Sequence, residues 1–274
     1  MRVGKVCRRL GMSLQNYYAR RTERQRRAVD EELIQALVVA ERRLQPRLGT
    51  RKLRVVLKGA LAQAGIKVGR DRFFEVLRKA DLLLAPYRSE QPCTTSSYHS
   101  LGVFKNLVKE RPVAAPNEVW VSDLTYLRTE EGFLYLALLT DKWSRKIVGY
   151  HCGDTLETAG CLNALAMALR DLPAGAKPIH HSDRGSQYCS HEYVNTLTAH
   201  RLGVSMTEVN HCAENALAER MNGILKAEYG LGKKIKTKAL ARRLTDQAVE
   251  LYNTRRPHSM LADEFPAVVH SLAA

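Results

Sequence analysis

Apolar side chains recur at helical intervals over the first third of the chain. Spacings of three and four residues are typical of helices that bury one face. One predicted helix begins with Asp30 as its cap, and a second is capped by Thr50 and ends at Gly65. A third begins near Arg70. Two helices joined by a glycine-containing turn indicate a helix-turn-helix region over residues 29–85. A helical bundle with a solvated basic face is the alternative.

A smaller basic segment, residues 1–28, precedes this region. A short helix, Gly11, Ser13 as an N-cap and a second helix would form a second helix-turn-helix-like piece. A frayed basic arm is an equal alternative. The segment carries a run of five arginines: Arg20, Arg21, Arg24, Arg26 and Arg27.

The pattern changes twice further along the chain. Residues 86–117 are rich in proline and polar residues and are expected to form a linker. From residue 118 the runs VWVSDLTYL, FLYLALLT and KIVGYHC are rich in β-branched and aromatic residues, which predicts three antiparallel strands. Gly132 would turn the first pair.

Helical and strand patterns then alternate up to residue 229. The prediction is an α/β catalytic core over 118–229, with a mixed sheet and helices on its faces. Residues 230–274 form a C-terminal helical extension that contains the run YNTRRPHSML.

The last helix of the predicted core separates apolar from polar side chains. Asn215 is a suitable N-cap, and Met221 and Leu225 belong to one apolar arc. Glu219 and Lys226 fall on the opposite side of that helix. Taken alone, such a pair is usually a solvent-exposed Glu and Lys on an amphipathic helix.

Composition narrows the class of protein. The chain has 274 residues and a net charge of +15, which favours a polyanionic partner, nucleic acid first. The cysteines form no C-x-x-C pair, which makes a zinc ribbon or finger unlikely. The sequence also has no run of about 18 apolar residues, so no membrane span is predicted. Scattered cysteines without a secretory signal indicate a cytoplasmic protein. The basic residues of the helix-turn-helix region are candidates for DNA contact: Arg70, Arg72, Arg78 and Lys79.

Three carboxylates lie on elements that can converge. Asp123 lies in the first strand, Asp183 ends the fourth, and Glu219 lies on the last helix of the core. Magnesium prefers oxygen ligands and is usually held by one or two carboxylates with substrate phosphates. Two metals can clamp the attacking and leaving oxygens of a phosphoryl transfer. Without metal, the like charges repel, and a looser arrangement is expected.

These motifs together resemble those of a known family. The runs that carry the resemblance are WVSDLTY with Asp123, HSDRGSQY with Asp183, NALAERMNGILK with Glu219, DKWSRKIVGY and YNTRRPHSML. Thirty-five residues separate Asp183 from Glu219, which is the spacing of the family. The chain is similar to the DDE transposases of bacterial insertion sequences, in particular the OrfB proteins of insertion-sequence family three, whose core is like that of retroviral integrases.

The resemblance implies a ribonuclease H-like fold and metal-dependent DNA cleavage and strand transfer at the element's ends. It implies that Asp123, Asp183 and Glu219 are catalytic residues that hold Mg²⁺ or Mn²⁺, as two ions. Lys226 corresponds to a basic residue that approaches DNA, and Asn222 and Arg184 are neighbouring candidates for DNA contact.

One departure leaves an alternative ligand. The family often has Asp-Asn-Ala before the glutamate helix, whereas this chain has Glu214 before Asn215. Glu219 is preferred over Glu214 because it has the family spacing and lies opposite the apolar arc. His180, His181, His191 and His211 are expected to be structural residues.

The resemblance also implies partners. DNA is the expected substrate, with a homo-oligomer on paired transposon ends and action at the bacterial nucleoid. The OrfA product encoded upstream is a further candidate partner. A DNA-binding regulator that is inactive without OrfA and a ribonuclease H-like nuclease are the two alternatives.

Overall fold

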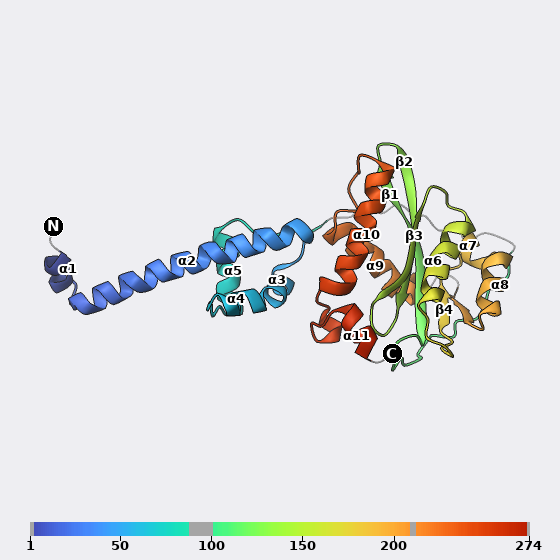
Figure 1. Cartoon of the computed structure of the whole chain (residues 1–274), viewed down its shortest axis with the longest axis horizontal. Helices are drawn as coiled ribbons and strands as arrows, with labels where there is room; N and C mark the ends of the chain where they lie inside the picture. The colour runs from blue at the N-terminus through green and yellow to red at the C-terminus, as the bar shows by residue number, and fades with distance from the viewer. Residues whose placement is uncertain (1–2, 88–100, 209–211, 273–274) are drawn as a thin grey trace. The chain divides into compact units, whose positions relative to one another are not determined.

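The computed structural model describes residues 3–87, 101–208 and 212–272 (Figure 1). These residues fall into two compact units. One comprises Met1–Leu44 and Leu48–Ala85, and the other Gln45–Arg47 and Pro86–Ala274. The division at 85/86 coincides with the predicted start of the linker.

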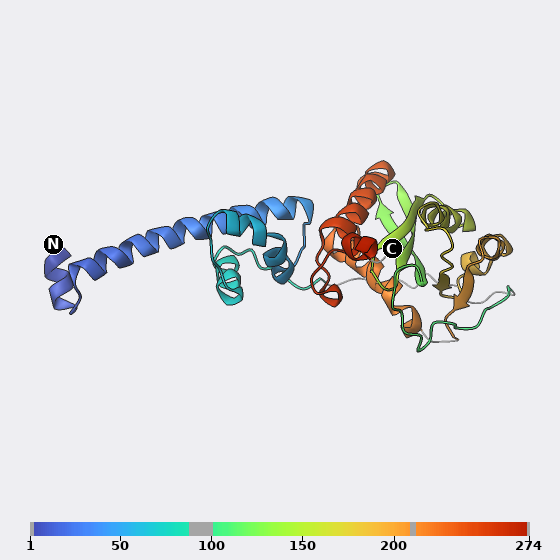
Figure 2. The ribbon, with the colours of Figure 1, turned by 60° about the horizontal axis from the view of Figure 1, so that its bottom comes forward.

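The N-terminal unit is helical. Helices α3, α4 and α5 lie along the C-terminal half of α2, while α1 lies at its N-terminal end (Figure 2). Their apolar faces bury Ile34 and Val38 of α2 against Leu53 and Phe73. The helices are α1 (Val3–Arg9), α2 (Leu14–Leu44), α3 (Thr50–Val56), α4 (Lys58–Gln63) and α5 (Arg70–Lys79).

Two predicted helix starts in this unit are wrong. Helix α2 continues through Asp30, which therefore caps nothing, so the boundary drawn between residues 28 and 29 falls inside one helix. The reason is local: residues 20–32 contain neither glycine nor proline, and Arg and Glu are good helix formers. Helix α3 is preceded by Gly49 as N-cap, with Thr50 already inside it.

The glycine and serine signals are confirmed. The Ser13 Oγ accepts a bond from the Asn16 N–H (3.1 Å), which caps α2. Gly65 adopts φ +70°, and the Ile66 N–H bonds the Leu61 carbonyl (2.9 Å), as in a glycine-ended helix.

A five-stranded mixed sheet forms the centre of the second unit. Its order is β3-β2-β1-β4-β5; β1, β2 and β3 are antiparallel neighbours, and β4 and β5 run parallel to β1. Gly132, with φ +108°, makes the first turn as expected. The strands are β1 (Val119–Thr129), β2 (Gly132–Asp141), β3 (Ile147–Gly153), β4 (Ile179–Ser182) and β5 (Gly203–Met206).

Helices cover both faces of this sheet (Figure 1). One face packs against α6 (Thr158–Arg170), α7 (Ser186–Cys189) and α8 (His191–Ala199), and the other against α9 (Ala216–Glu228) and α10 (Lys238–Arg255). Helix α11 (Pro266–Leu272) follows and packs on α10. This is the ribonuclease H-like α/β arrangement.

The second half of the predicted linker packs on this core. Val108 is buried with Val119 and Val121, and the Leu107 N–H donates to the Ser205 Oγ (2.8 Å). The core therefore begins before residue 118. The first half of the linker, including residues 88–100, lies largely outside the described residues.

The run YNTRRPHSML ties the C-terminal extension to the core. The Asn253 side chain bonds both the N–H and the carbonyl of Ile147 (2.9 and 3.0 Å). The buried Arg256 guanidinium makes two bonds to the Glu228 carboxylate at the end of α9 (2.7 and 2.8 Å). Paired bonds between fixed planar groups are specific in geometry as well as strong.

Candidate active site

Strand register brings the two aspartates to one edge of the sheet. The pairing of β4 with β1 ends at Val121, opposite His181. The same register, carried two residues further, sets Asp123 opposite Asp183, just past the end of β4. Neighbouring strands lie ~4.8 Å apart, so adjacent positions of this kind hold side chains close together.

Helix α9 is held against β1 by three side chains that point from it to the strand. Asn215, at the start of α9, donates its Nδ2–H to the Ser122 carbonyl (3.0 Å). Asn222 donates to the Asp123 Oδ2 (2.7 Å) and Lys226 to the Thr125 Oγ1 (2.6 Å). Each successive donor reaches a later residue of β1, which fixes both the position and the rotation of α9.

Two of these contacts differ from the expectations. The Asn215 side chain caps no N–H of α9; instead its amide N–H is donated to β1, which fixes the orientation of the side chain. The buried Asn222 side chain bonds an aspartate, so its structural role here is to orient Asp123. Its DNA contact remains a prediction.

The electrostatics of Asp123 link the three carboxylates. Burial, then the negative charge of Asp183 and, more weakly, that of Glu219, raise the pKa of Asp123 to about 7. The Asn222 hydrogen bond acts in the opposite direction and lowers that pKa. A carboxyl group that is about half protonated at pH 7 is the expected result when like charges share a desolvated site.

Glu214 lies in a different set of contacts. Its Oε2 accepts from the Asn106 Nδ2 (2.7 Å) and from the Glu208 N–H (2.7 Å). Glu219, by contrast, is an exposed side chain in the first turn of α9 whose charge acts on Asp123.

Asp183 and Arg184 also make local bonds. The Asp183 Oδ1 accepts the Gly185 N–H (3.0 Å), which shapes the turn into α7. Arg184 donates its Nε–H to the Thr207 carbonyl (2.7 Å), beyond the end of β5. Arg184 is therefore partly committed to the fold, and its DNA contact remains a prediction.

The histidines on β4 are engaged in buried hydrogen bonds. The His180 Nε2 lies 2.9 Å from the Tyr193 hydroxyl, and the His181 Nδ1 lies 2.9 Å from the Ser205 Oγ. Burial lowers the pKa of His180 to about 3, with a smaller contribution from His181. His211 lies outside the described residues.

The donor chemistry suits a hard divalent cation. Asp123, Asp183 and Glu219 offer only carboxylate oxygens, and the repulsion that raises the pKa of Asp123 is what a cation would relieve. Over residues 3–87, 101–208 and 212–272, no three His, Cys, Asp or Glu side chains already stand as a group that could hold a metal ion. A pair of carboxylates completed by substrate phosphate is the usual magnesium arrangement.

The basic residues predicted in the helix-turn-helix region have different surroundings. Arg72 is paired with Glu31 of α2 and with Glu75 (2.7 Å), so it joins two helices. Lys79 also reaches Glu75 (3.2 Å), and the exposed Arg70 reaches Asp71 (2.9 Å). Arg78 is exposed near the end of α5. Their contacts with DNA remain predictions.

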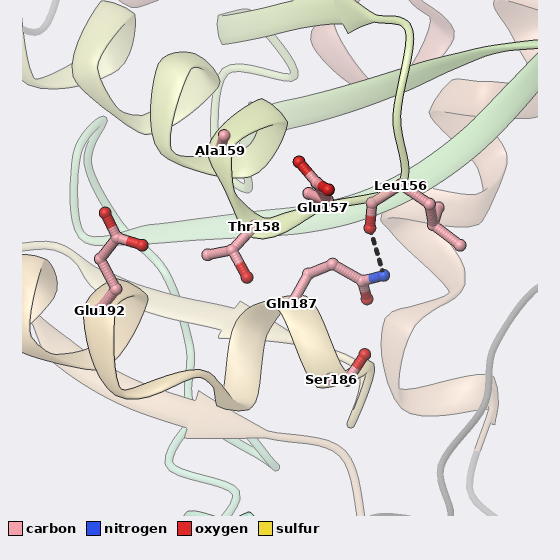
Figure 3. A pocket seen from close by; sticks show the side chains of 7 residues that line it. All are labelled: Leu156, Glu157, Thr158, Ala159, Ser186, Gln187 and Glu192. Atoms are coloured by element: carbon pink, nitrogen blue, oxygen red, sulfur yellow. Dashed lines mark hydrogen bonds between the residues drawn. The ribbon is translucent and has the colours of Figure 1, made fainter.

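A separate hollow beside the sheet does not fit DNA phosphate. It lies between the start of α6 and α7–α8, where Gln187 donates to the Leu156 carbonyl (2.8 Å; Figure 3). Its lining includes the carboxylates of Glu157 and Glu192 and no lysine or arginine. That charge is wrong for a polyanion.

Sequence reasoning missed three parts of this site. The bonds of Asn215 to β1 and of Arg256 to Glu228 depend on tertiary packing. The stacking of Lys226 over the Tyr126 ring, with Nζ 4.7 Å from the centroid, depends on both α9 and β1. Of these residues, only Arg256 had a signal in the sequence, because it belongs to the run YNTRRPHSML.

No helix in the described part of the chain is long and apolar enough to cross a membrane.

Comparison with known proteins shows the family of this chain. The Integrase core domain family matches residues 113–212, and a second family of the same description matches residues 200–266. An uncharacterized 31 kDa protein of insertion element IS600 from Shigella sonnei is 37% identical over 98% of this chain and 100% of its own length. The transposase InsF of insertion sequence IS3A from Escherichia coli K12 is 36% identical over 67% of this chain and 64% of InsF.

Among solved structures, the HTLV-2 integrase catalytic core in complex with magnesium matches with a TM-score of 0.46 and 20% identity. That match covers 57% of this chain and 97% of the integrase core. The BIV integrase core matches with a TM-score of 0.43 and 14% identity, over 57% of this chain and 95% of its own.

Sheet order, covering helices and carboxylate positions together define an integrase-type core, the fold of a class of polynucleotidyl transferases. The chain belongs to the IS3-type family of insertion-sequence transposases.

Proposed function

We propose that this transposase cuts and joins DNA strands at the ends of its insertion sequence with Asp123, Asp183 and Glu219 as the catalytic carboxylates. The observation that carries the proposal is the half-buried Asp123 carboxylate, which accepts the Asn222 bond (2.7 Å) and whose pKa of about 7 reflects desolvation and the charges of Asp183 and Glu219. Functional sites are where such perturbed carboxylates concentrate.

The same three residues would hold Mg²⁺ or Mn²⁺, as two ions. When bound, the ions would supply electrostatic stabilisation of the attacking and leaving oxygens. In the reaction, water or a 3′-hydroxyl attacks a phosphodiester phosphorus, and the bond from phosphorus to the leaving 3′-oxygen breaks.

The protein's own contribution is orientation. Asn222 holds the Asp123 Oδ2 at 2.7 Å and favours its ionised form, which is the form able to bind a cation. Asn215 and Lys226 fix α9, and hence Glu219, along β1. Lys226 is half-buried beside Asp123 and offers a positive charge to a substrate phosphate.

The proposed partners follow from charge and family. The substrate is DNA, both at the transposon ends and at the target, and the net charge of +15 favours its binding. Two ends must be paired, so the active form is a homo-oligomer on DNA at the bacterial nucleoid. The OrfA product is the proposed additional partner.

The test compares two glutamates five positions apart. Glu219→Gln removes the anionic ligand at constant size, so cleavage of a labelled transposon end with Mg²⁺ should fall by orders of magnitude while DNA binding persists. Glu214→Gln is the matched control and should retain most cleavage. Assays include OrfA if the chain alone is inactive.

Three outcomes would contradict the proposal. If Glu219→Gln cuts and joins as well as the parent, the carboxylate assignment is wrong. If Glu214→Gln abolishes cleavage and Glu219→Gln does not, Glu214 is the third ligand. A parent chain that binds DNA but stays inactive with OrfA would favour a regulatory role.

A further inference from the structure

The β1–β2 hairpin carries an aromatic surface that α6 leaves uncovered. Tyr126 lies opposite Tyr135 in the antiparallel pair, and Arg128 lies opposite Phe133, so these side chains share one face of the sheet. Together with Leu124 and Leu156 they line a hollow of about 460 Å³.

Two apolar side chains of this hollow are exposed to solvent. Phe133 is 52% exposed and Leu156 38%, while Tyr126 and Tyr135 are half-buried. The rings of Phe133 and Tyr126 meet edge to face, with centroids 5.5 Å apart and planes at 89°. Single exposed apolar residues are common, but several around one hollow are characteristic of a binding site.

Lys226 connects this hollow to the carboxylates. Its Nζ lies 2.6 Å from the Thr125 Oγ1 and 4.7 Å from the centroid of the Tyr126 ring. The contact is possible because β4 pairs with β1 only as far as Val121, which leaves this part of the edge to α9. Tyr126 is three residues from Asp123, ~10 Å along the strand and on the opposite face of the sheet, so the hollow and the carboxylates meet around the edge of β1 that Lys226 crosses.

We propose that this hollow, which we call the aromatic hollow (Leu124, Tyr126, Phe133, Tyr135 and Leu156), stacks an unpaired nucleobase of the DNA next to the cleavage site. This inference rests on the proposed function, because it assumes that the carboxylates act on DNA. Lys226 and Arg128 place positive charge beside the rings, as a nucleotide with both a base and a phosphate requires.

An unpaired base fits better than intact duplex. Every base has a π-face, so any base can stack on an aromatic side chain without dependence on sequence. Within a duplex those faces are already stacked on neighbouring bases. A base at a frayed or overhanging end can enter the hollow, as bases do when proteins take them out of the stack.

The experiment uses the full chain and two duplex probes. One carries a two-nucleotide overhang containing 2-aminopurine, and the other is the same duplex with blunt ends. Phe133→Leu keeps an apolar side chain but removes the ring; Phe104→Leu, at a 36% exposed phenylalanine on residues 101–105, is the matched control. Circular dichroism confirms that each variant is folded.

The parent should quench 2-aminopurine and bind the overhang more tightly than the blunt duplex. Phe133→Leu should lose about tenfold in affinity for the overhang, within the range of one lost stack, and should leave blunt-duplex binding unchanged. Phe104→Leu should behave as the parent. Equal losses on both probes, or no loss on either, would overturn the proposal.

Two further measurements separate this inference from its alternatives. Glu219→Gln should keep the overhang preference, so a failure of the carboxylate assignment would be seen in cleavage alone. Sedimentation without DNA tests whether a second copy of the chain fills the hollow. If Phe133→Leu dissociates an oligomer of the parent, the hollow is a protein interface and the nucleobase proposal is wrong.

Discussion

The Asn222 Nδ2 lies 2.7 Å from the Asp123 Oδ2, and this bond, like the Leu124 N–H, opposes the burial and the like charges that raise the pKa of that carboxylate. Burial and the neighbouring carboxylates favour the protonated acid, whereas a donated hydrogen bond favours the ionised form. Asn222 therefore keeps Asp123 available as an anion near neutral pH, at a position where desolvation would otherwise neutralise it.

Replacing Asn222 should shift the pH dependence of cleavage. A hydrogen bond to a charged group is worth ~1.5–3 kcal/mol, and each pKa unit corresponds to ~1.4 kcal/mol. In Asn222→Ala the pKa of Asp123 should rise by about one unit, so the acid limb of the rate profile moves to higher pH. Rates measured from pH 5.5 to 9 check this, with exposed Asn195→Ala on α8 as the control.

A merely structural effect of Asn222→Ala would look different. The loss in rate should be relieved by higher pH or higher Mg²⁺ concentration, because protons and cations compete for the same carboxylate. A loss that is equal at every pH and every Mg²⁺ concentration would contradict the orienting role.

The raised pKa of Asp123 also predicts a stability effect. An aspartate in the unfolded chain titrates near 3.9, and Asp123 in the folded protein near 7. The folded state binds this proton more tightly, so the contribution of Asp123 is favourable below about pH 4 and is lost as pH rises through 7. Asp123→Asn removes the penalty and should stabilise the metal-free protein at pH 8 by up to ~4 kcal/mol, because the pKa differs by about three units at ~1.4 kcal/mol each.

Thermal unfolding at pH 4.5 and pH 8 tests this sign. The gain from Asp123→Asn should be large at pH 8 and small at pH 4.5, and Mg²⁺ should reduce it by stabilising the parent. Asp154→Asn is a control of opposite sign, because bonds from Lys238 and Arg242 lower the pKa of that exposed aspartate. A parent that is more stable than Asp123→Asn at pH 8 without metal would contradict the prediction.

Local pattern was sufficient for the strands, whereas the choice of carboxylates also needed the family spacing. The runs around Asp123 and Asp183 carry β-branched and aromatic residues, and the pairing of β1 with β4, which ends two residues earlier, would set the two aspartates opposite one another if it continued. Glu219 was preferred for its spacing from Asp183 and for its place opposite the apolar arc of α9, whose Met221 and Leu225 are buried.

The remaining parts of the site depend on how helices and strands that are distant in the sequence pack against one another. Asn215 looks like a cap in the sequence, but its oxygen caps no N–H of α9, and its side chain is oriented by the amide N–H that it donates to the Ser122 carbonyl. No local rule foretells that choice, because it is made when α9 docks on β1. The helix start predicted at Asp30 is wrong for a different reason: an aspartate resembles a cap even where the helix runs past it.

The Arg256–Glu228 pair should be a main stabilising contact of the C-terminal extension. Removing one partner of a buried ion pair costs ~3–5 kcal/mol, because the other charge is left buried and unpaired. Arg256→Ala and Glu228→Ala should each cost this much, and the double variant clearly less than the sum. Chemical denaturation of all three gives the coupling energy.

The exposed pair Arg170–Asp171 (3.1 Å) provides the control cycle. Both of its side chains are largely exposed, so its coupling should stay below about 1 kcal/mol. Arg256→Lys should behave like Arg256→Ala, because an ammonium cannot make the paired bonds of a guanidinium. Equal coupling in the buried and exposed pairs would contradict a special role for Arg256.

Two arginines of α5 should separate DNA affinity from stability. Arg72 joins α5 to α2 through Glu31, and it also pairs with Glu75. Arg72→Gln should therefore destabilise the N-terminal unit, but by less than about 1 kcal/mol, since the pair is partly exposed to solvent. Arg78→Gln should leave stability unchanged, because that side chain is exposed.

DNA binding should depend more on Arg78 than on Arg72, which is the reverse of their order for stability. Each phosphate neutralised on duplex DNA contributes about −0.9 to the slope of log affinity against log salt concentration. Arg78→Gln should flatten that slope by up to one contact. Replacing four exposed arginines of α2 (Arg20, Arg21, Arg24 and Arg26) with glutamine should flatten it further. Filter binding of the full chain from 50 to 300 mM salt checks both variants. A slope unchanged in both would mean that this charge is a solvated surface and that DNA affinity resides in the integrase-type core.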